Sequence, residues 1–114
     1  MHRRIICLTL IAALAGCGAP AAPRAEDRAR ADAGMAALVA MYNDNVGRWT
    51  STGWWNNANA LEATIDYMAR TGSRDELPLL EITYRENSYA GFLNDYYDDQ
   101  LWWALAWLKA YDLT

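Results

Sequence analysis

Tyr96-Tyr97-Asp98-Asp99-Gln100-Leu101-Trp102-Trp103, followed by the apolar run over residues 104–111, is the stretch that decides the fold of this chain. The segment predicts a helix over about residues 98–112 in which only Gln100, Lys109 and Asp112 are strongly polar beyond the two opening aspartates. A helix that is apolar on nearly every side is normally buried in a large protein or in a membrane. Its charged ends disfavour the membrane, so we predict a buried helix with two carboxylates at its mouth.

Three earlier segments have the periodicity of amphipathic helices. The first follows a charged, alanine-rich stretch, and its apolar face is predicted to contain Met35, Leu38, Val39, Tyr42, Val46 and Trp49. The second begins near Trp54 or Trp55 and runs to about Arg70, and Gly72 suits the left-handed residue that follows a helix end. The third begins near Pro78, because proline is tolerated in the first turn of a helix.

No segment of useful length has the period of a β-strand, so the fold class is predicted to be all-α. Amphipathic helices alternating with a more uniformly apolar one are typical of a two-layer helical toroid. Four helices cannot close such a ring, and the last would expose its far face. Because apolar patches beyond a few hundred Å² are unusual on soluble monomers, we expect an incomplete domain whose reading frame continues past Thr114.

The N-terminus has the pattern of a bacterial export signal. Positive charge at Arg3 and Arg4 precedes an apolar run over residues 5–15, which is shorter than the roughly 20 residues of a spanning helix. Leu14-Ala15-Gly16-Cys17 resembles the lipobox of lipoproteins, in which the cysteine carries the lipid. We predict a signal peptide over 1–16, a tether over 17–30 and the domain over 31–114. An ordinary secretory signal with an incidental cysteine is the alternative.

Cysteine and histidine usage excludes several kinds of site. Cys7 leaves with the signal peptide, Cys17 is acylated, and the only histidine is His2. The mature domain therefore has no disulfide and no thiolate or histidine metal site, and we predict no metal and no cofactor. Of ten Lys and Arg, Arg3 and Arg4 precede Cys17, which leaves eight against fourteen Asp and Glu, a net charge of −6. This acidic balance disfavours nucleic acid as a partner.

The adjacent carboxylates Asp98 and Asp99 have two interpretations. Aspartate is a favoured N-cap, and we expect the pair at the N-cap and first helical positions. Capping needs only one carboxylate, however, and two neighbouring charges repel unless the second is used. Glycoside hydrolysis requires two carboxylates, about 5–5.5 Å apart in retaining enzymes and about 6.5–9.5 Å apart in inverting ones. Adjacent residues favour the shorter separation and hence retention.

Two motifs resemble glycoside hydrolase family 76, whose members act on α-1,6-linked mannan. They are Phe92-Leu93-Asn94-Asp95-Tyr96-Tyr97-Asp98-Asp99-Gln100-Leu101-Trp102-Trp103 and Gly53-Trp54-Trp55-Asn56-Asn57-Ala58-Asn59-Ala60-Leu61-Glu62. The resemblance runs over about residues 33–114 and covers only the first part of the family's (α/α)6 barrel. It implies a retaining endo-α-1,6-mannanase with Asp98 as nucleophile and Asp99 as general acid/base, and it implies that the 114-residue chain alone is inactive.

The same resemblance indicates which residues lie at the substrate and where the protein acts. Tryptophans can stack on mannose and amides can bridge its hydroxyls; the residues expected there are Trp54, Trp55, Asn56, Asn59, Tyr97 and Trp103. Trp102 and Trp103 stand on opposite sides of their helix, so at most one of them faces the cleft. The partners are then an α-mannan glycan and, through Cys17, the membrane of the cell envelope. Gly18 after the cysteine favours the outer membrane in a bacterium with two membranes.

Four alternatives stay open. A non-catalytic, lipid-anchored glycan-binding protein would keep the tryptophans and use the aspartates for capping and hydroxyl contacts. Another (α/α)6 enzyme, such as a glycan lyase or an unsaturated-uronyl hydrolase, would require a basic cleft, which the scattered arginines do not provide. Transglycosylation in place of hydrolysis is also compatible with a covalent glycosyl intermediate, as is exo in place of endo action.

Overall fold

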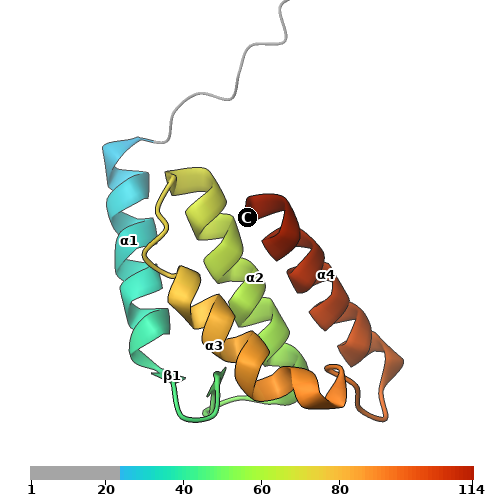
Figure 1. Cartoon of the computed structure of the whole chain (residues 1–114). Helices are drawn as coiled ribbons and strands as arrows, with labels where there is room; N and C mark the ends of the chain where they lie inside the picture. Colours follow the sequence, from blue (N-terminus) through green and yellow to red (C-terminus); the bar gives the residue numbers. More distant parts are fainter. Residues whose placement is uncertain (1–23) are drawn as a thin grey trace, which may run out of the picture.

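The computed structural model describes residues 24–114 and is predominantly helical (Figure 1). The predicted signal peptide over 1–16 and the predicted lipidation site Cys17 lie outside the described residues. The helices are α1 (Ala25–Ala40), α2 (Trp54–Thr71), α3 (Leu77–Asn87), the 3₁₀ turn η1 (Ser88–Ala90) and α4 (Tyr97–Leu113), and a hairpin of β1 (Tyr42–Asn43) and β2 (Arg48–Trp49) follows α1. The all-α prediction is confirmed, and within the described residues no helix is long and apolar enough to cross a membrane.

The first helix differs from its prediction at both ends. It begins at Ala25, inside the segment expected as a tether, where Arg28 pairs with Asp32 at 2.7 Å one turn away. It ends at Ala40, and Tyr42 and Trp49, expected on the same helix, face each other across the β1–β2 hairpin with ring centroids 4.9 Å apart. Tyr42 and Trp49 are seven positions apart, a spacing that fits two turns of helix as well as this hairpin. The predicted continuation of the helix to Trp49 is therefore wrong.

A glycine accounts for the hairpin. Gly47 has a φ of +63°, which disfavours residues with a Cβ, and a Cβ there would lie 2.9 Å from the carbonyl oxygen of Ile82. Asn43 accepts a hydrogen bond from the backbone N–H of Asn45 at 3.0 Å, a local turn that competes with the helix. The chain therefore reverses here and returns Trp49 to the core.

The other helices agree with the sequence pattern. Helix α2 buries Ala58, Leu61, Ile65 and Met68 along one face, with Trp54 half-buried at its start, and ends at Gly72, which has a φ of +76°. Proline occupies the first turn of α3, as expected. Helix α4 buries one face with Trp103, Ala106 and Ala110, but its far face remains exposed.

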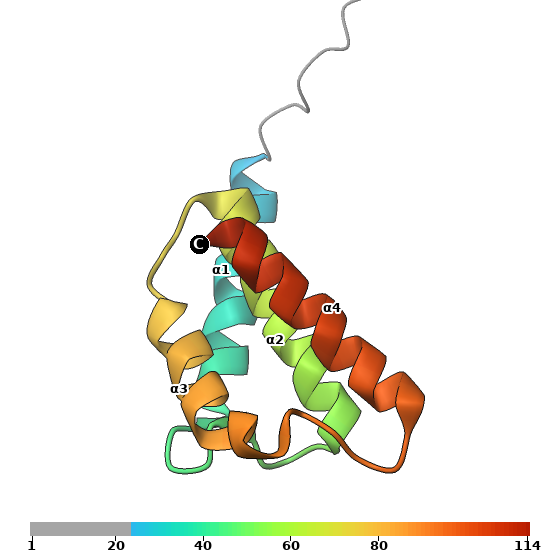
Figure 2. The ribbon, with the colours of Figure 1, turned by 45° about the vertical axis from the view of Figure 1, so that its right-hand side comes forward.

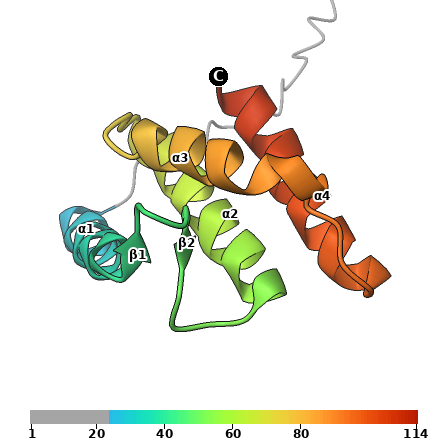
Figure 3. The same cartoon turned by 60° about the horizontal axis from the view of Figure 1, so that its bottom comes forward.

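The helices form two antiparallel hairpins. Figures 1 and 2 show α2 and α4 side by side and running in the same direction, while α1 and α3 run the opposite way. Figure 3 shows α1 and α4 on opposite sides of α2, with α3 crossing the upper part of the view. The most extensive helix contact is between α2 and α4.

An aromatic cluster joins the N-terminal halves of α2 and α4. The ring of Trp103 lies 4.9 Å from that of Trp54 and 4.9 Å from that of Phe92, and Trp107 continues the cluster 5.2 Å from Phe92. Trp103 is only 1% exposed. Burying rings of this size contributes much of the packing energy of a small core.

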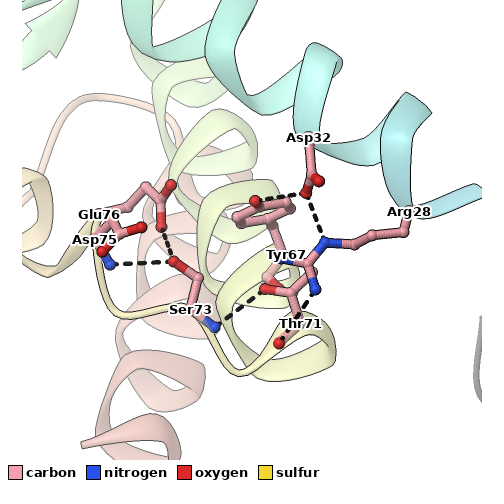
Figure 4. A network of polar contacts seen from close by, with 7 residues as sticks. All are labelled: Arg28, Asp32, Tyr67, Thr71, Ser73, Asp75 and Glu76. Carbon is pink, nitrogen blue, oxygen red and sulfur yellow. Dashed lines mark hydrogen bonds and ion pairs between the residues drawn. The ribbon is translucent and has the colours of Figure 1, made fainter. Parts of the chain in front are cut away.

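A polar network joins α1 to the C-terminal end of α2 (Figure 4). The carboxylate of Asp32 accepts hydrogen bonds from Arg28 at 2.7 Å and from the Tyr67 hydroxyl at 2.8 Å. Arg28, and then Tyr67, lower the pKa of Asp32 below its ordinary value. Because the folded-state pKa is depressed, this contribution to stability is present above the ordinary pKa and is lost as pH falls through the lowered value.

We predict that Asp32→Asn lowers the melting temperature at neutral pH and that the difference from the unsubstituted protein narrows below pH 3.8, the ordinary pKa of this carboxyl. Thermal unfolding followed by circular dichroism over this pH range measures it. Asp75→Asn is the control, because Asp75 joins the contacts drawn in Figure 4 through its backbone N–H, which donates to Ser73 Oγ at 3.1 Å, and not through its carboxylate. An equal deficit at every pH would contradict the prediction.

We also predict that Trp103→Ala lowers the free energy of unfolding by about 3–5 kcal/mol, because it leaves a large cavity in the aromatic cluster. The adjacent Trp102 is 39% exposed, so Trp102→Ala is expected to cost much less. Urea denaturation of the two variants provides the comparison. Equal losses for the two substitutions would refute the assignment of Trp103 to the core.

Candidate carboxylate site

The two aspartates lie in the first turn of α4, two positions later than predicted. The N-cap is Tyr96, whose extended backbone precedes the helix and whose side chain makes no cap hydrogen bond. Asp98 and Asp99 are therefore the second and third helical residues. Negative charge is still favoured there, because the free N–H groups and the helix dipole create a positive end. The prediction that Asp98 is the N-cap residue is therefore wrong.

The carboxylate of Asp99 is buried and held by an amide. The residue is 8% exposed, and Asn94 Nδ2 donates a hydrogen bond of 2.6 Å to Asp99 Oδ2. Asn94 is itself fixed to the same turn, because its Oδ1 accepts from the backbone N–H of Tyr96 at 3.0 Å and its carbonyl accepts from Gln100 Nε2 at 2.7 Å. These contacts hold the orientation of one carboxylate of the pair.

The loop that presents Asn94 is anchored in the core. Gly91 and Phe92 both have left-handed backbones, with φ values of +63° and +58°. This conformation is unfavourable for an aromatic residue, by roughly 1–3 kcal/mol. Phe92 is nevertheless only 8% exposed, and its ring packs 4.9 Å from that of Trp103 and 5.2 Å from that of Trp107. Packing of the ring therefore maintains the turn that delivers Asn94 to Asp99.

Asp98 lies on a different side of α4 and is exposed. Consecutive residues of a helix diverge by about 100°, so the two side chains leave the helix in different directions. Asp98 shares its face with Trp102 and Lys109. Lys109 pairs with Glu62 at 2.6 Å and Asp66 at 2.9 Å on α2, and these partners, Glu62 first, raise the pKa of the lysine.

The residues of α2 that were expected at the substrate differ in exposure and in packing. Trp54 is half-buried against Trp103, with the guanidinium of Arg48 5.4 Å from its ring centroid. Trp55 is 45% exposed, and Asn56 and Asn59 are half-buried. The Asn59 side chain donates to the carbonyl of Trp55 at 3.4 Å. Trp55 and the two amides remain available to a ligand, whereas Trp54 is mainly a packing residue.

The two α4 aromatics expected at the substrate, Tyr97 and Trp103, differ in exposure. Trp103 is a core residue, 1% exposed and packed against α2, whereas Tyr97 is 82% exposed. Both line a hollow of about 570 Å³ beside α4, together with Gln100, and neither aspartate lines it. Trp102 is the partly exposed member of the tryptophan pair.

Sequence analysis missed two asparagines. Asn94 stands five residues before Asp99 in a loop, where no periodicity could have revealed the contact. Asn57 was part of a quoted motif but is structural: it is 3% exposed, accepts from the Trp49 backbone N–H at 2.7 Å and donates to the Gly53 carbonyl at 2.7 Å. It thereby fixes β2 to the start of α2.

No group of three or more metal-ligating side chains occurs within residues 24–114. The site consists of two neighbouring carboxylates, one exposed and one held by an amide, next to a partly exposed tryptophan; carboxylates of this kind are able to act as acids, bases or nucleophiles.

We predict that Asn94→Ala lowers the free energy of unfolding by about 1–3 kcal/mol, because the buried Asp99 carboxylate loses its partner. A double-mutant cycle with Asp99→Ala, measured by urea denaturation, isolates the pair and should give a clear coupling energy. Asn45→Ala, at an exposed turn, is the control. Strictly additive losses would contradict the contact.

No family model, no curated protein and no solved structure matches this chain. What the site can do is accordingly argued from its own residues.

Proposed function

We propose that this chain is the N-terminal part of a glycoside hydrolase that resembles family 76, a retaining endo-α-1,6-mannanase. The observation that carries the proposal is the pair of neighbouring carboxylates at the N-terminal end of α4. One is exposed and the other is buried and fixed by an amide. Tyr96 is the N-cap, so neither aspartate caps the helix, and the positive helix end favours negative charge at both positions.

The different surroundings of the pair fit a division of labour. In the proposed reaction the exposed Asp98 attacks the anomeric carbon and forms a glycosyl ester, while Asp99 gives a proton to the departing glycosidic oxygen. Water then attacks the ester, Asp99 takes its proton, and Asp98 is released. Asn94 would hold the Asp99 carboxylate in one orientation through both steps.

The proposed architecture is an (α/α)6 barrel in which α2 and α4 are neighbouring inner helices. Their parallel course, with α1 and α3 antiparallel to them, supports it. An exposed apolar stripe on α4, Leu101, Leu105 and Leu108, would be covered by further helices.

The proposed partners are an α-mannan glycan and a membrane, the latter through a lipid on Cys17. An exported, envelope-anchored enzyme would act on polysaccharide outside the cytoplasm. The signal that supports this anchor lies in the sequence alone, at Leu14-Ala15-Gly16-Cys17. No nucleic acid, metal or cofactor belongs to the proposal.

The second candidate function is a non-catalytic, lipid-anchored glycan-binding protein. The partly exposed Trp55 and Trp102 favour it equally, because stacking on a sugar does not require turnover. The two functions differ in what the carboxylates do. In a binding protein Asp99→Asn should leave glycan affinity intact, whereas in an enzyme it should remove turnover.

We predict that the protein expressed from its complete gene cleaves α-1,6-linked mannan and first releases the α-anomer. Asp98→Asn and Asp99→Asn should each lower kcat by a factor of about 10²–10⁴, the usual contribution of a positioned acid, base or nucleophile. Reducing-end release and proton NMR of the first product measure rate and stereochemistry.

Asp95→Asn is the matched control for these two substitutions, because Asp95 is an exposed aspartate in the preceding loop. It should leave kcat unchanged. Mannan binding without any cleavage would contradict the proposed hydrolase and support the glycan-binding protein instead. Cleavage that survives both Asp98→Asn and Asp99→Asn would overturn the assignment of the pair.

A further inference from the structure

We infer that Trp102, together with Trp55, forms a sugar-stacking platform in the seam between α2 and α4, next to Asp98. Trp102 is thereby assigned a ligand contact that the sequence pattern gave to Trp103. The ligand class is a neutral hexose unit of a glycan. The identity of this ligand rests on the proposed function, whereas the position of the two tryptophans on one side of the seam follows from the register of α2 and α4.

The ion pairs at the other end of the seam fix the register of the two helices. Lys109 on α4 reaches both Glu62 and Asp66 on α2, at 2.6 and 2.9 Å. Seven residues make nearly two full turns, since a turn takes 3.6 residues. On each of the two parallel helices, the residue seven positions earlier therefore lies on the same face, about 10 Å closer to the N-terminus. Trp102 thus occupies on α4 the place that corresponds to Lys109, and Trp55 and Asn59 occupy on α2 the places that correspond to Glu62 and Asp66.

The helices remain in contact at this level. Trp54, the neighbour of Trp55, packs at 4.9 Å from Trp103, the neighbour of Trp102. The buried contact thus lies on the core side of the seam, and Trp55 and Trp102 lie on its outer side. Their exposed fractions, 45% and 39%, agree with rings that are supported on one face and open on the other.

The same seam contains the chemistry that the ligand would need. Asp98 stands four residues before Trp102, which is one turn away on the same face of α4. Asn59 is half-buried and supplies an amide beside the rings. An indole ring offers an apolar face to the C–H side of a sugar and an N–H to a hydroxyl. A neutral sugar is favoured over an acidic one, because Lys109 is already paired with two carboxylates and Asp98 would repel an anion.

The test uses the protein expressed from its complete gene, with Asp98→Asn introduced to prevent turnover. Affinity for an α-1,6-linked mannotetraose is measured by titration calorimetry. Trp102→Ala in this background should weaken binding by about tenfold or more, as expected for truncation of an aromatic anchor. Trp102→Phe should restore most of the affinity. The control is Tyr89→Ala, an aromatic on η1 that is 90% exposed and distant from the seam in the chain; it should bind normally.

The result that overturns the inference is a Trp102→Ala variant that binds the oligosaccharide as tightly as its parent, or a loss that Trp102→Phe does not recover. Cleavage of mannan by the unsubstituted protein is measured in parallel. If cleavage occurs while Trp102→Ala binds normally, the platform is wrong and the proposed function stands. If neither cleavage nor binding is found, the proposed function and the sugar platform both fail.

Discussion

The packing of Trp54 and Phe92 against Trp103 is the interaction on which the rest of this structure depends. It holds the N-terminal halves of α2 and α4 together, and the Lys109 ion pairs to Glu62 and Asp66 fix the other end of the same helix pair. Two parallel helices joined at both ends have a defined register. The outer face of the pair therefore carries Trp55, Trp102 and Asp98 in fixed relative positions.

The same cluster governs the carboxylates. Phe92 keeps a left-handed backbone because its ring is packed against Trp103 and Trp107, and the loop that follows carries Asn94 to the Asp99 carboxylate. The cost of the unfavourable backbone conformation is offset by ring burial. Asp99 is therefore buried and hydrogen-bonded to Asn94, whereas Asp98, its neighbour in the sequence, is exposed. That separation is what makes a two-carboxylate mechanism the preferred proposal over capping.

The helices α2, α3 and α4 and the Gly72 helix end followed from spacing and from the local preferences of proline and glycine. The hairpin at residues 42–49 did not, because Tyr42 and Trp49 are seven apart, a separation that suits one helix face as well as a hairpin closed by Gly47. Exposure of Trp102 and burial of Trp103 could not be read from sequence either. Only the position of α2 decides between two adjacent apolar residues, and the Asn94 contact depends on a loop without periodicity.

A covalent intermediate on Asp98 is the most direct test of the account. The protein expressed from its complete gene would be incubated with an activated, fluorine-substituted mannosyl substrate, digested and analysed by mass spectrometry. Because Asp98 is the proposed nucleophile, we expect a glycosyl ester on the peptide that contains Asp98 and no ester in the Asp98→Asn variant. An ester on another residue, or rapid turnover with inversion and no ester at all, would contradict it.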